Sequence, residues 1–310
     1  MLNKSQSITS VVALVFVAIT TIYLTNNVSN IKNVKNEKLL INGSNTLSRS
    51  LVVATRIHRG NSTQLPSLTS ISDFIRSIGY AKLIILSIGI GDKLENIDYI
   101  HKLESYLQNE GLMPSSSSTT TATTSIIILP VTPWGKFTMG LNAILLKCIE
   151  EKYDLIAFQS LEFRIPKMNV EKLTDVIYDD KYTLVVGPAL PGHEFKLGNN
   201  KIEGRTCPWN TFAIWNINYL GLIGFPMVGD GLGTDASGVE EVTTVNLLQK
   251  INNKLKVILV SMKGLEWKVD FQDEKRQAYH DEKMKSKNER PHEQMKWLGI
   301  QSGTVKHIEG

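Results

Sequence analysis

The 310-residue sequence has little cysteine, few aromatic residues and a small net charge. Its two cysteines, Cys148 and Cys207, allow at most one disulfide. The alternative is that Cys148, which lies on an apolar helix face, is a buried thiol. The formal net charge is +4, and lysine and arginine are dispersed except near the C-terminus. We therefore expect no nucleic-acid binding, since that function needs a large basic surface.

Several patterns that would indicate a specific chemistry are also missing. The chain has no Cys-His zinc pattern, no phosphate-binding Gly-x-x-x-x-Gly-Lys loop and no Gly-x-Ser-x-Gly elbow. His193 and His292 have no partners at metal-ligand spacing. The 42% hydrophobic content suffices for one large domain or two small ones, which excludes a wholly disordered protein.

The N-terminus predicts a membrane anchor. Residues 8–24 carry no charge and, as a helix, are just long enough to cross a thin bilayer. No small-x-small cleavage site follows them, which favours a retained signal anchor over a cleaved signal peptide; a buried core helix is the alternative. Residues 1–7 would then form a cytosolic tail.

Glycosylation acceptor sequences indicate the orientation. Asn27, Asn42 and Asn61 begin such sequences, and none follows residue 63. Lysines after the apolar segment outnumber Lys4 before it, which weakens the positive-inside argument. We expect a single-pass type II membrane protein whose globular part lies in the lumen of the Golgi or the endoplasmic reticulum.

The rest of the chain divides by composition. Residues 25–78 are rich in asparagine, serine, threonine and lysine, which predicts a flexible stem. A globular domain is expected over 79–300, and a tail over 301–310.

Within that domain, apolar and periodic segments alternate. Apolar runs predict strands at 82–88, 125–131, 153–158, 182–187, 210–216 and 256–260. Helical spacing predicts helices at 94–109, 170–178 and 239–251. This alternation indicates an α/β fold with a mostly parallel sheet.

Two acidic residues follow predicted strands. Glu162 comes after the strand at 153–158, and Asp92 lies in the turn after the strand at 82–88. Ligands of doubly wound folds bind at the carboxyl ends of such strands, so both are candidate ligand contacts. The alternative for Glu162 is that it merely caps a strand end on the surface.

A highly charged helix is expected over 273–289, with Pro291 as its stop. Most such helices are simply solvated. However, His280, Lys283 and Lys287 share one helical face, and a cationic face beside a carboxylate-lined sheet edge would suit a diphosphate.

The order of these segments resembles the nucleotide-sugar-binding glycosyltransferases of the GT-A fold, especially the inverting, family-2-like group. Gly140–Cys148 is similar to the family's Ala-Leu-Asn-x-Gly-x-x-x-Ala sequence, and Ser160–Glu162 follows at the place of its Asp-x-Asp motif. Asn210–Ala213, Ile223–Pro226 and Gly238–Val242 are similar to the later landmarks. The order of the motifs carries the resemblance, and the Gln-x-x-Arg-Trp sequence of processive members is absent.

The resemblance implies a single GT-A-like domain with a mostly parallel mixed sheet. Its activity would be transfer of a sugar from a UDP- or GDP-sugar to an unknown glycan, protein or lipid acceptor, with inversion. Glu241, or else Glu240, would be the base that takes the acceptor proton, although glutamates at a helix start also simply suit the helix dipole. The residues implied in donor binding are Glu162, Asp92, Trp209, Asn210, His280 and Lys283. Trp134 and Trp267 are further stacking candidates, with core packing as the alternative.

Metal binding is the point where the sequence departs from the family. The family's Asp-x-Asp motif holds a divalent cation, whereas Ser160 and Glu162 provide one carboxylate. Mn²⁺ or Mg²⁺ could still bind through Glu162 and His280, or Lys283 could replace the ion in part. The rival function is a glycosyltransferase-like binding or scaffold protein that has lost catalysis. An unrelated α/β hydrolase is a third possibility, but no nucleophile and base pair argues for it.

Overall fold

The computed structural model describes residues 51–58, 65–90, 96–114, 124–268 and 274–310. They belong to one compact unit, Ser50–Gly310. The predicted anchor at 8–24, the three glycosylation acceptors and Asp92 lie outside the described residues. Within the described ranges, every helix is too short or too polar to cross a membrane.

The fold is organised around a nine-stranded sheet in the order β3-β2-β1-β4-β8-β6-β9-β11-β7. Only β8 and β7 run antiparallel to their neighbours, so the predicted α/β class with a mostly parallel sheet is confirmed. The strands are β1 Leu51–Ile57, β2 Leu83–Gly89, β3 Ser125–Val131, β4 Leu155–Gln159, β6 Thr183–Pro188, β7 Gly198–Lys201, β8 Phe212–Asn216, β9 Lys256–Ser261 and β11 Thr304–Glu309. A separate pair joins β5 Phe163–Arg164 to β10 Glu266–Trp267.

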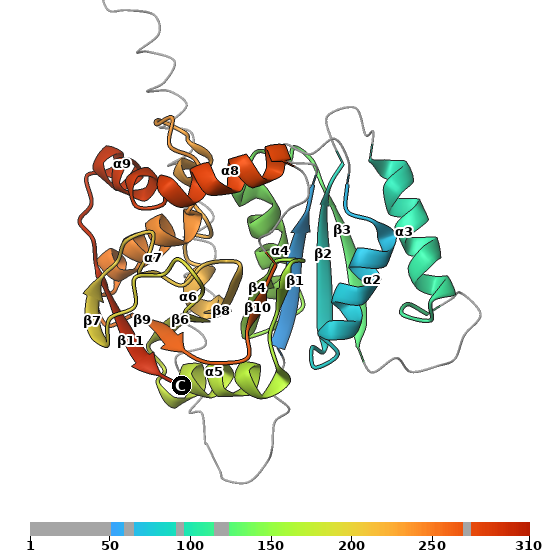
Figure 1. Ribbon diagram of the computed structural model, residues 1–310, viewed down its shortest axis with the longest axis horizontal. Coiled ribbons are helices and arrows are strands. Elements are labelled where there is room, and N and C mark those ends of the chain that lie inside the picture. The colour runs from blue at the N-terminus through green and yellow to red at the C-terminus, as the bar shows by residue number, and fades with distance from the viewer. Residues whose placement is uncertain (1–50, 59–64, 91–95, 115–123, 269–273) are drawn as a thin grey trace, which may run out of the picture. The chain divides into compact units, whose positions relative to one another are not determined.

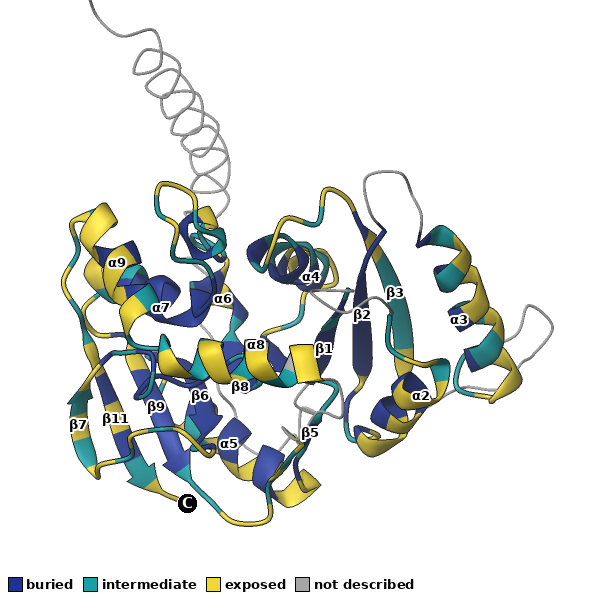
Figure 2. Cartoon of the chain, turned by 45° about the horizontal axis from the view of Figure 1, so that its top comes forward, coloured by how far each residue is buried: buried dark blue, intermediate teal, exposed yellow. Residues whose placement is uncertain are grey.

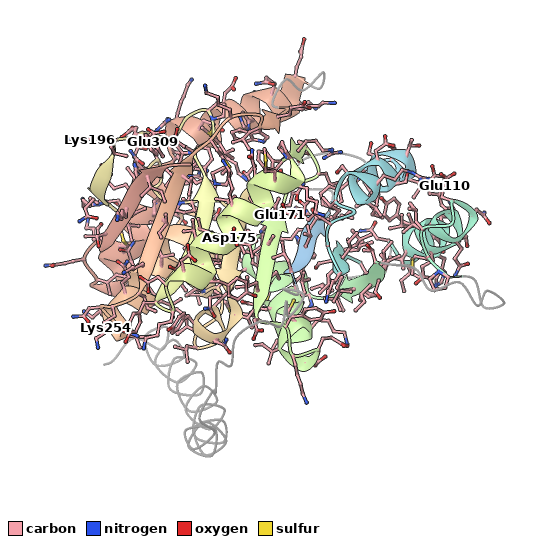
Figure 3. All side chains as sticks on the ribbon, turned by 90° about the horizontal axis from the view of Figure 1, so that it is seen from below. Glu110, Glu171, Asp175, Lys196, Lys254 and Glu309 are labelled. Carbon is pink, nitrogen blue, oxygen red and sulfur yellow. The ribbon has the colours of Figure 1, made fainter. Side chains whose placement is uncertain are left out.

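Helices cover both faces of the sheet (Figure 1). One core cluster contains residues of α2, α3 and α5, and a second contains residues of α4, α6 and α7. The helices are α2 Leu68–Ser77, α3 Ile97–Asn109, α4 Thr138–Glu150, α5 Lys167–Asp179, α6 Ile217–Leu220, the 3₁₀ helix η1 Met227–Asp230, α7 Glu240–Ile251, α8 Glu274–Lys285 and α9 Glu289–Leu298. Charged side chains such as Glu110, Glu171 and Lys254 are exposed outside these layers (Figure 3).

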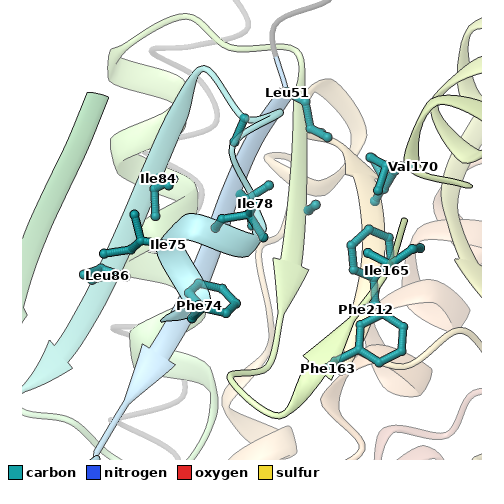
Figure 4. Close-up of a cluster of buried hydrophobic side chains, with 14 of the residues drawn as sticks. Leu51, Phe74, Ile75, Ile78, Ile84, Leu86, Phe163, Ile165, Val170 and Phe212 are labelled. Atoms are coloured by element: carbon teal, nitrogen blue, oxygen red, sulfur yellow. The ribbon is translucent and has the colours of Figure 1, made fainter. Parts of the chain in front are cut away.

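Side chains of β1 alternate between the two cores. Leu51 and Val53 pack in the cluster with α2, whereas Val52 and Ala54 pack in the cluster with α4. Figure 4 shows Leu51 in the first cluster beside residues of α2 and β2. A fully buried aliphatic side chain stabilises a fold by about 1.5–3 kcal/mol. The buried side chains of β1 therefore contribute substantially to the stability of the domain.

The prediction that residues 25–78 form a stem is therefore wrong from Leu51 onward. The apolar run of β1 is short because Thr55 and Arg56 follow it, and the surrounding composition is polar. A strand covered on both faces shows no alternation that would reveal it. Helix α2 follows, begun by Ser67, whose hydroxyl oxygen accepts a hydrogen bond from the Ser70 amide at 3.1 Å.

The prediction of a tail at 301–310 is also wrong, because β11 inserts between β9 and β7. His307 is fully buried there. Its Nδ1 lies 3.1 Å from the Lys196 amide nitrogen and its Nε2 lies 3.0 Å from the Thr206 carbonyl oxygen. A histidine bonded on both ring nitrogens can be buried, which its polarity conceals in the sequence.

The charged C-terminal segment forms two helices instead of one. Pro291 does not stop a helix, since it lies in the first turn of α9. Its missing N–H has no role in that turn, which is why proline is tolerated there. The other predicted helices and strands are found within a few residues of their expected bounds.

Both cysteines are buried free thiols. Burial raises the pKa of Cys148 to about 12, so it remains a neutral, apolar group in the core. Cys148 is therefore a buried thiol, the alternative to a disulfide.

Candidate functional site

Two buried glutamates begin α7, a helix that is largely buried (Figure 2). Glu240 and Glu241 are each 4% exposed. The Glu240 carboxylate lies 3.3 Å from Arg56 Nη2 and accepts a hydrogen bond from Asn210 Nδ2 at 3.4 Å. Asn210 and Glu240, both predicted for the site, are thus in contact, and Arg56 joins them.

The Glu241 carboxyl has an altered affinity for protons. Burial, reinforced by the negative charge of Glu240, raises the pKa of Glu241 to about 7, against the opposing positive charges of Lys287 and Arg56. A carboxylate that titrates near neutral pH is suited to accept a proton from a substrate hydroxyl.

A group of cations surrounds this acidic pair, which we call the cation cluster and define as Arg56, Lys283, Lys287 and Arg290. Arg56 Nη1 donates to the Phe137 carbonyl oxygen at 2.6 Å, and Lys283 Nζ lies 4.4 Å above the Phe137 ring. Arg290 Nη2 donates to the Lys283 carbonyl oxygen at 2.7 Å. Arg56 comes from β1, and the other three come from α8, α9 and their connection.

Burial weakens proton binding by the two lysines. It lowers the pKa of Lys283 to about 8, assisted by the charges of Arg290, Arg56 and Lys287, while Glu240 opposes the shift. Burial likewise lowers the pKa of Lys287, with Arg290 assisting and Glu241 opposing. Figure 1 shows α8 passing across the molecule from α9 toward α4.

Trp209 does not offer an open stacking face. It is 1% exposed, its Nε1 donates to the Gly204 carbonyl oxygen at 2.6 Å, and the His193 ring stacks on it at 3.7 Å. Lys287 Nζ lies 3.6 Å from the ring centre. Trp209 therefore packs between His193 and Lys287, and donor stacking by Trp209 stays a prediction.

Two further predicted residues pack beside Trp209. The Trp267 ring meets it edge-on at 5.9 Å, and His280 meets Trp267 edge-on at 5.7 Å. The face that His280, Lys283 and Lys287 were expected to share therefore turns toward the sheet edge.

Ser160 and Glu162 lie just beyond the carboxyl end of β4. The Ser160 amide donates to the Thr211 carbonyl oxygen at 2.9 Å, and Thr211 adjoins Asn210, which contacts Glu240. The segments around residues 160 and 240 therefore meet at the same sheet edge, as the sequence predicted.

The described residues at this edge offer few side-chain ligands for a divalent metal ion. Mn²⁺ and Mg²⁺ take about six ligands, mostly oxygen, whereas Ser160 and Glu162 offer one hydroxyl and one carboxylate. In the part of the chain that the structure describes, no three His, Cys, Asp or Glu side chains gather to hold a metal. The proposed pairing of Glu162 with His280 around an ion has no third ligand of this kind there.

Buried polar atoms without partners mark the same edge. Among the described residues, Asn96 Oδ1, Trp134 Nε1 and Ser160 Oγ are buried and have no hydrogen-bond partner. They follow β2, β3 and β4, respectively. Because buried polar atoms are nearly always hydrogen-bonded, three such atoms at one edge suggest a polar ligand.

The sequence analysis missed part of this edge. Arg56 lies in β1 and His58 follows that strand, which was assigned to the stem. The signal that could have found them is the apolar run before Thr55. The His58 ring lies 5.0 Å from that of Trp134, and burial lowers the pKa of His58 to about 4. His58 is therefore neutral near pH 7.

No protein-family model matches the chain, and no curated protein matches its sequence. Solved structures similar to it include a glycosyltransferase and nucleotidyltransferases. A mannosyltransferase from Pyrobaculum calidifontis, solved with GDP-mannose and Mn²⁺, has a TM-score of 0.44 and 10% identity over 78% of this chain. The chain spans 64% of that mannosyltransferase, which is less than two thirds of its length.

Two nucleotidyltransferases are also similar in structure. A 4-diphosphocytidyl-2C-methyl-D-erythritol synthase from Anaerococcus prevotii has a TM-score of 0.42 and 11% identity, with 75% of this chain and 99% of its own covered. A cytidylyltransferase from Leptospira borgpetersenii has a TM-score of 0.38 and 11% identity, with 69% of this chain and 75% of its own covered.

Proposed function

We propose that this protein is a glycosyltransferase with a GT-A-like domain that transfers a sugar from a nucleotide sugar to an acceptor hydroxyl. The observation that carries the proposal is the burial of Glu240 and Glu241 against Arg56 and Asn210. This acidic pair lies at the edge where the sequence resemblance puts a catalytic base. A buried acid beside cations suits both halves of the reaction, because a proton must leave the acceptor and negative charge develops on the departing diphosphate.

The two glutamates have different roles in the proposal. Glu241 takes the proton from the acceptor hydroxyl as the oxygen attacks the anomeric carbon, the bond to the diphosphate breaks, and the configuration inverts. Glu240, held by Arg56 and Asn210, fixes the start of α7 and hence the position of Glu241. Raised proton affinity supports Glu241 as the base.

Binding and transfer measured on separate variants test this function. Calorimetric titration with UDP, GDP and their sugars would establish donor binding, and a donor-hydrolysis or transfer assay would establish turnover. Glu241→Gln should bind donor but lose about 100-fold or more in turnover, as expected for loss of a general base. The exposed Glu171→Gln is the control and should have wild-type turnover. Absence of binding by every nucleotide and sugar nucleotide would refute the proposal.

One observation favours a second function. Ser160 replaces the first acid of the family motif, and no three His, Cys, Asp or Glu side chains gather to hold a metal among the described residues. A protein that binds a nucleotide sugar without transferring it, and serves as a binding or scaffold protein, would have this feature. Donor binding without hydrolysis or transfer under any condition would support this alternative.

The location of the protein follows from the sequence prediction. We propose a type II membrane protein anchored by residues 8–24, with the domain in the Golgi or endoplasmic reticulum lumen. Glycan mapping at Asn27, Asn42 and Asn61 after expression in a eukaryotic host tests the orientation. Three unmodified acceptors would contradict a lumenal domain.

A further inference from the structure

A hollow of about 700 Å³ lies at the surface between α9 and the 231–238 loop, which leads from η1 toward α7. We call it the α9 hollow. Its volume lies within the range of small-molecule sites, roughly 300–1,000 Å³. The side chains that line it are mostly polar or charged, and one of them is an indole. They include Thr234, Asp235, Glu289, Glu293, Lys296 and Trp297.

One face of α9 forms a wall of the hollow. Glu289, Glu293 and Trp297 recur every fourth residue, so they follow one another along that face. Another face of α9 packs on α7, the helix beside it (Figure 2). There the Thr243 hydroxyl of α7 donates to Oε1 of the buried Gln294 at 2.6 Å. Because α9 is fixed through that buried face, two glutamates and a tryptophan are left at the hollow.

The opposite wall, the 231–238 loop, is hydrogen-bonded to α9. Gln294 Nε2 donates to two carbonyl oxygens of the loop, each at 2.9 Å. Arg290 Nη1 donates to a third at 3.0 Å. At the end of the loop, the Gly238 amide donates to the Gly229 carbonyl oxygen at 2.7 Å. Both walls are therefore held by contacts within the protein, and a ligand would not have to order them.

Trp297 offers an open aromatic surface. The ring packs against Gly233, where a Cβ atom would collide with it and where φ is +80°, so glycine is required. The ring is nevertheless 54% exposed, and its N–H makes no hydrogen bond to the described residues. A tryptophan that is held on one side and open on the other suits the apolar face of a sugar ring.

The carboxylates of the hollow determine which ligands fit it. Among the described residues, the side chains of Asp235 and Glu293 make no hydrogen bond or ion pair. With Glu289 they outnumber Arg290 and Lys296, which disfavours an anion. Within the described ranges, the three acids do not gather closely enough to hold a metal ion. Ionised carboxylates only accept hydrogen bonds, so the matching ligand is neutral and carries several hydroxyl donors.

We propose that the α9 hollow binds a neutral saccharide, with one sugar ring stacked on Trp297 and its hydroxyls donating to Asp235 and Glu293. The loop that forms one wall also leads into the acidic pair. A Cβ atom at Gly229 would lie 2.8 Å from the Cβ of Glu240. The saccharide is therefore assigned to the acceptor glycan. That assignment rests on the proposed function, whereas the saccharide site itself does not.

Titration of the full-length protein by saturation-transfer NMR tests the site. The neutral probes are chitotriose, maltotriose and mannotriose, and the acidic probe is a heparin tetrasaccharide. We expect at least one neutral probe to bind and heparin not to bind. Trp297→Ala should weaken binding about tenfold or more, and Glu293→Gln about threefold. The control is Tyr178→Ala, which removes an exposed aromatic ring from α5 and should bind as the wild type does.

A donor titration of the wild type separates this inference from the proposed function. Donor binding without binding of any neutral probe overturns the inference and leaves the proposed function standing. Saccharide binding that Trp297→Ala weakens, without donor binding, supports the site and contradicts the proposed function. Absence of both kinds of binding overturns both.

Three further results would overturn the inference. One is wild-type saccharide affinity in both Trp297→Ala and Glu293→Gln, each shown by thermal unfolding to be folded. Another is tighter binding of heparin than of every neutral probe. The third is a dimer in analytical ultracentrifugation that Trp297→Ala dissociates, because the hollow would then be an interface between two copies of the chain.

Discussion

The Arg56 guanidinium lies 3.3 Å from the Glu240 carboxylate, and this ion pair joins the first strand of the sheet to the start of α7. The carboxylate is nearly buried, whereas the guanidinium is one quarter exposed. Arg56 therefore neutralises the glutamate that positions the proposed base, and it also belongs to the cation cluster. Its position depends on β1, which the sequence analysis assigned to a stem.

Replacing Arg56 by Met should lower the free energy of unfolding by about 2 kcal/mol, because it removes the charged partner of a buried carboxylate. It should also weaken nucleoside diphosphate binding about tenfold or more. Urea unfolding and titration calorimetry measure the two effects. The control is Arg76→Met, whose partner Glu110 is exposed, so that change should cost less than about 1 kcal/mol. Equal losses in the two variants would contradict the prediction.

Glu241 should make stability depend on pH in an unusual direction. Its pKa is raised from 4.5 to about 7, so the folded protein holds a proton that the unfolded chain releases between these values. This contribution is fully present below about pH 4.5 and is lost as the pH rises through about 7. Glu241→Gln cannot lose that proton, so it should gain up to about 3 kcal/mol relative to the wild type between pH 4.5 and 7.

Urea unfolding of the wild type and of Glu241→Gln at several pH values measures this difference. His193 acts in the opposite direction, because burial lowers its pKa to about 3 and its contribution is lost as the pH falls below about 6.5. Both proteins contain His193, so its effect cancels in the comparison. A constant difference across the pH range would show that Glu241 titrates normally.

Gly204→Ala should disturb the site from a distance. A Cβ atom there would collide with the Lys287 carbonyl group, which is backbone and cannot simply rotate away. We expect a loss of about 1–3 kcal/mol in stability together with weaker nucleotide binding, because Lys287 is displaced. Gly79→Ala is the matched control, since its nearest neighbour would be an oxygen of Arg76 at 3.8 Å. Unchanged binding in Gly204→Ala would show that the connection between α8 and α9 adapts.

Truncations at the two ends test the corrected boundaries. A chain that starts at Ser50 retains β1 and should show a single cooperative unfolding transition, whereas one that starts at Arg59 lacks the strand between β2 and β4 and should not fold. Removal of 303–310 should also prevent folding, because it takes away β11 and buried His307. Circular dichroism with thermal unfolding distinguishes the outcomes. A folded chain without β1 would contradict the architecture.

Sequence patterns predicted the parts of the fold in which one physical signal dominates. Continuous apolar runs located β2 and β9, since strands buried on both faces exclude polar residues. They failed for β1, where Arg56 lies within the strand because its charge is used at the site. They also failed for β11, whose buried His307 is stabilised by partners far away in the sequence.

The residues of the candidate site were also predicted only in part. The order of landmarks brought Asn210 and Glu240 together. Helical spacing grouped Lys283 with Lys287, although α8 ends at Lys285 and Lys287 lies in the connection to α9. Sequence patterns could not show that Trp209 is enclosed, because its enclosure depends on His193 and on Lys287, which lies between α8 and α9. Asp92 lies outside the described residues, so its role stays a prediction.

The central position of β1 in the sheet also affects how the chain folds during its synthesis. During synthesis this strand leaves the ribosome before either neighbour, and its second edge gains a partner only when residues 155–159 emerge. Until then the nascent chain exposes an unpaired apolar strand, the kind of surface that chaperones protect and that otherwise aggregates. The cation cluster would be completed later still, once α8 and the start of α9 have been translated.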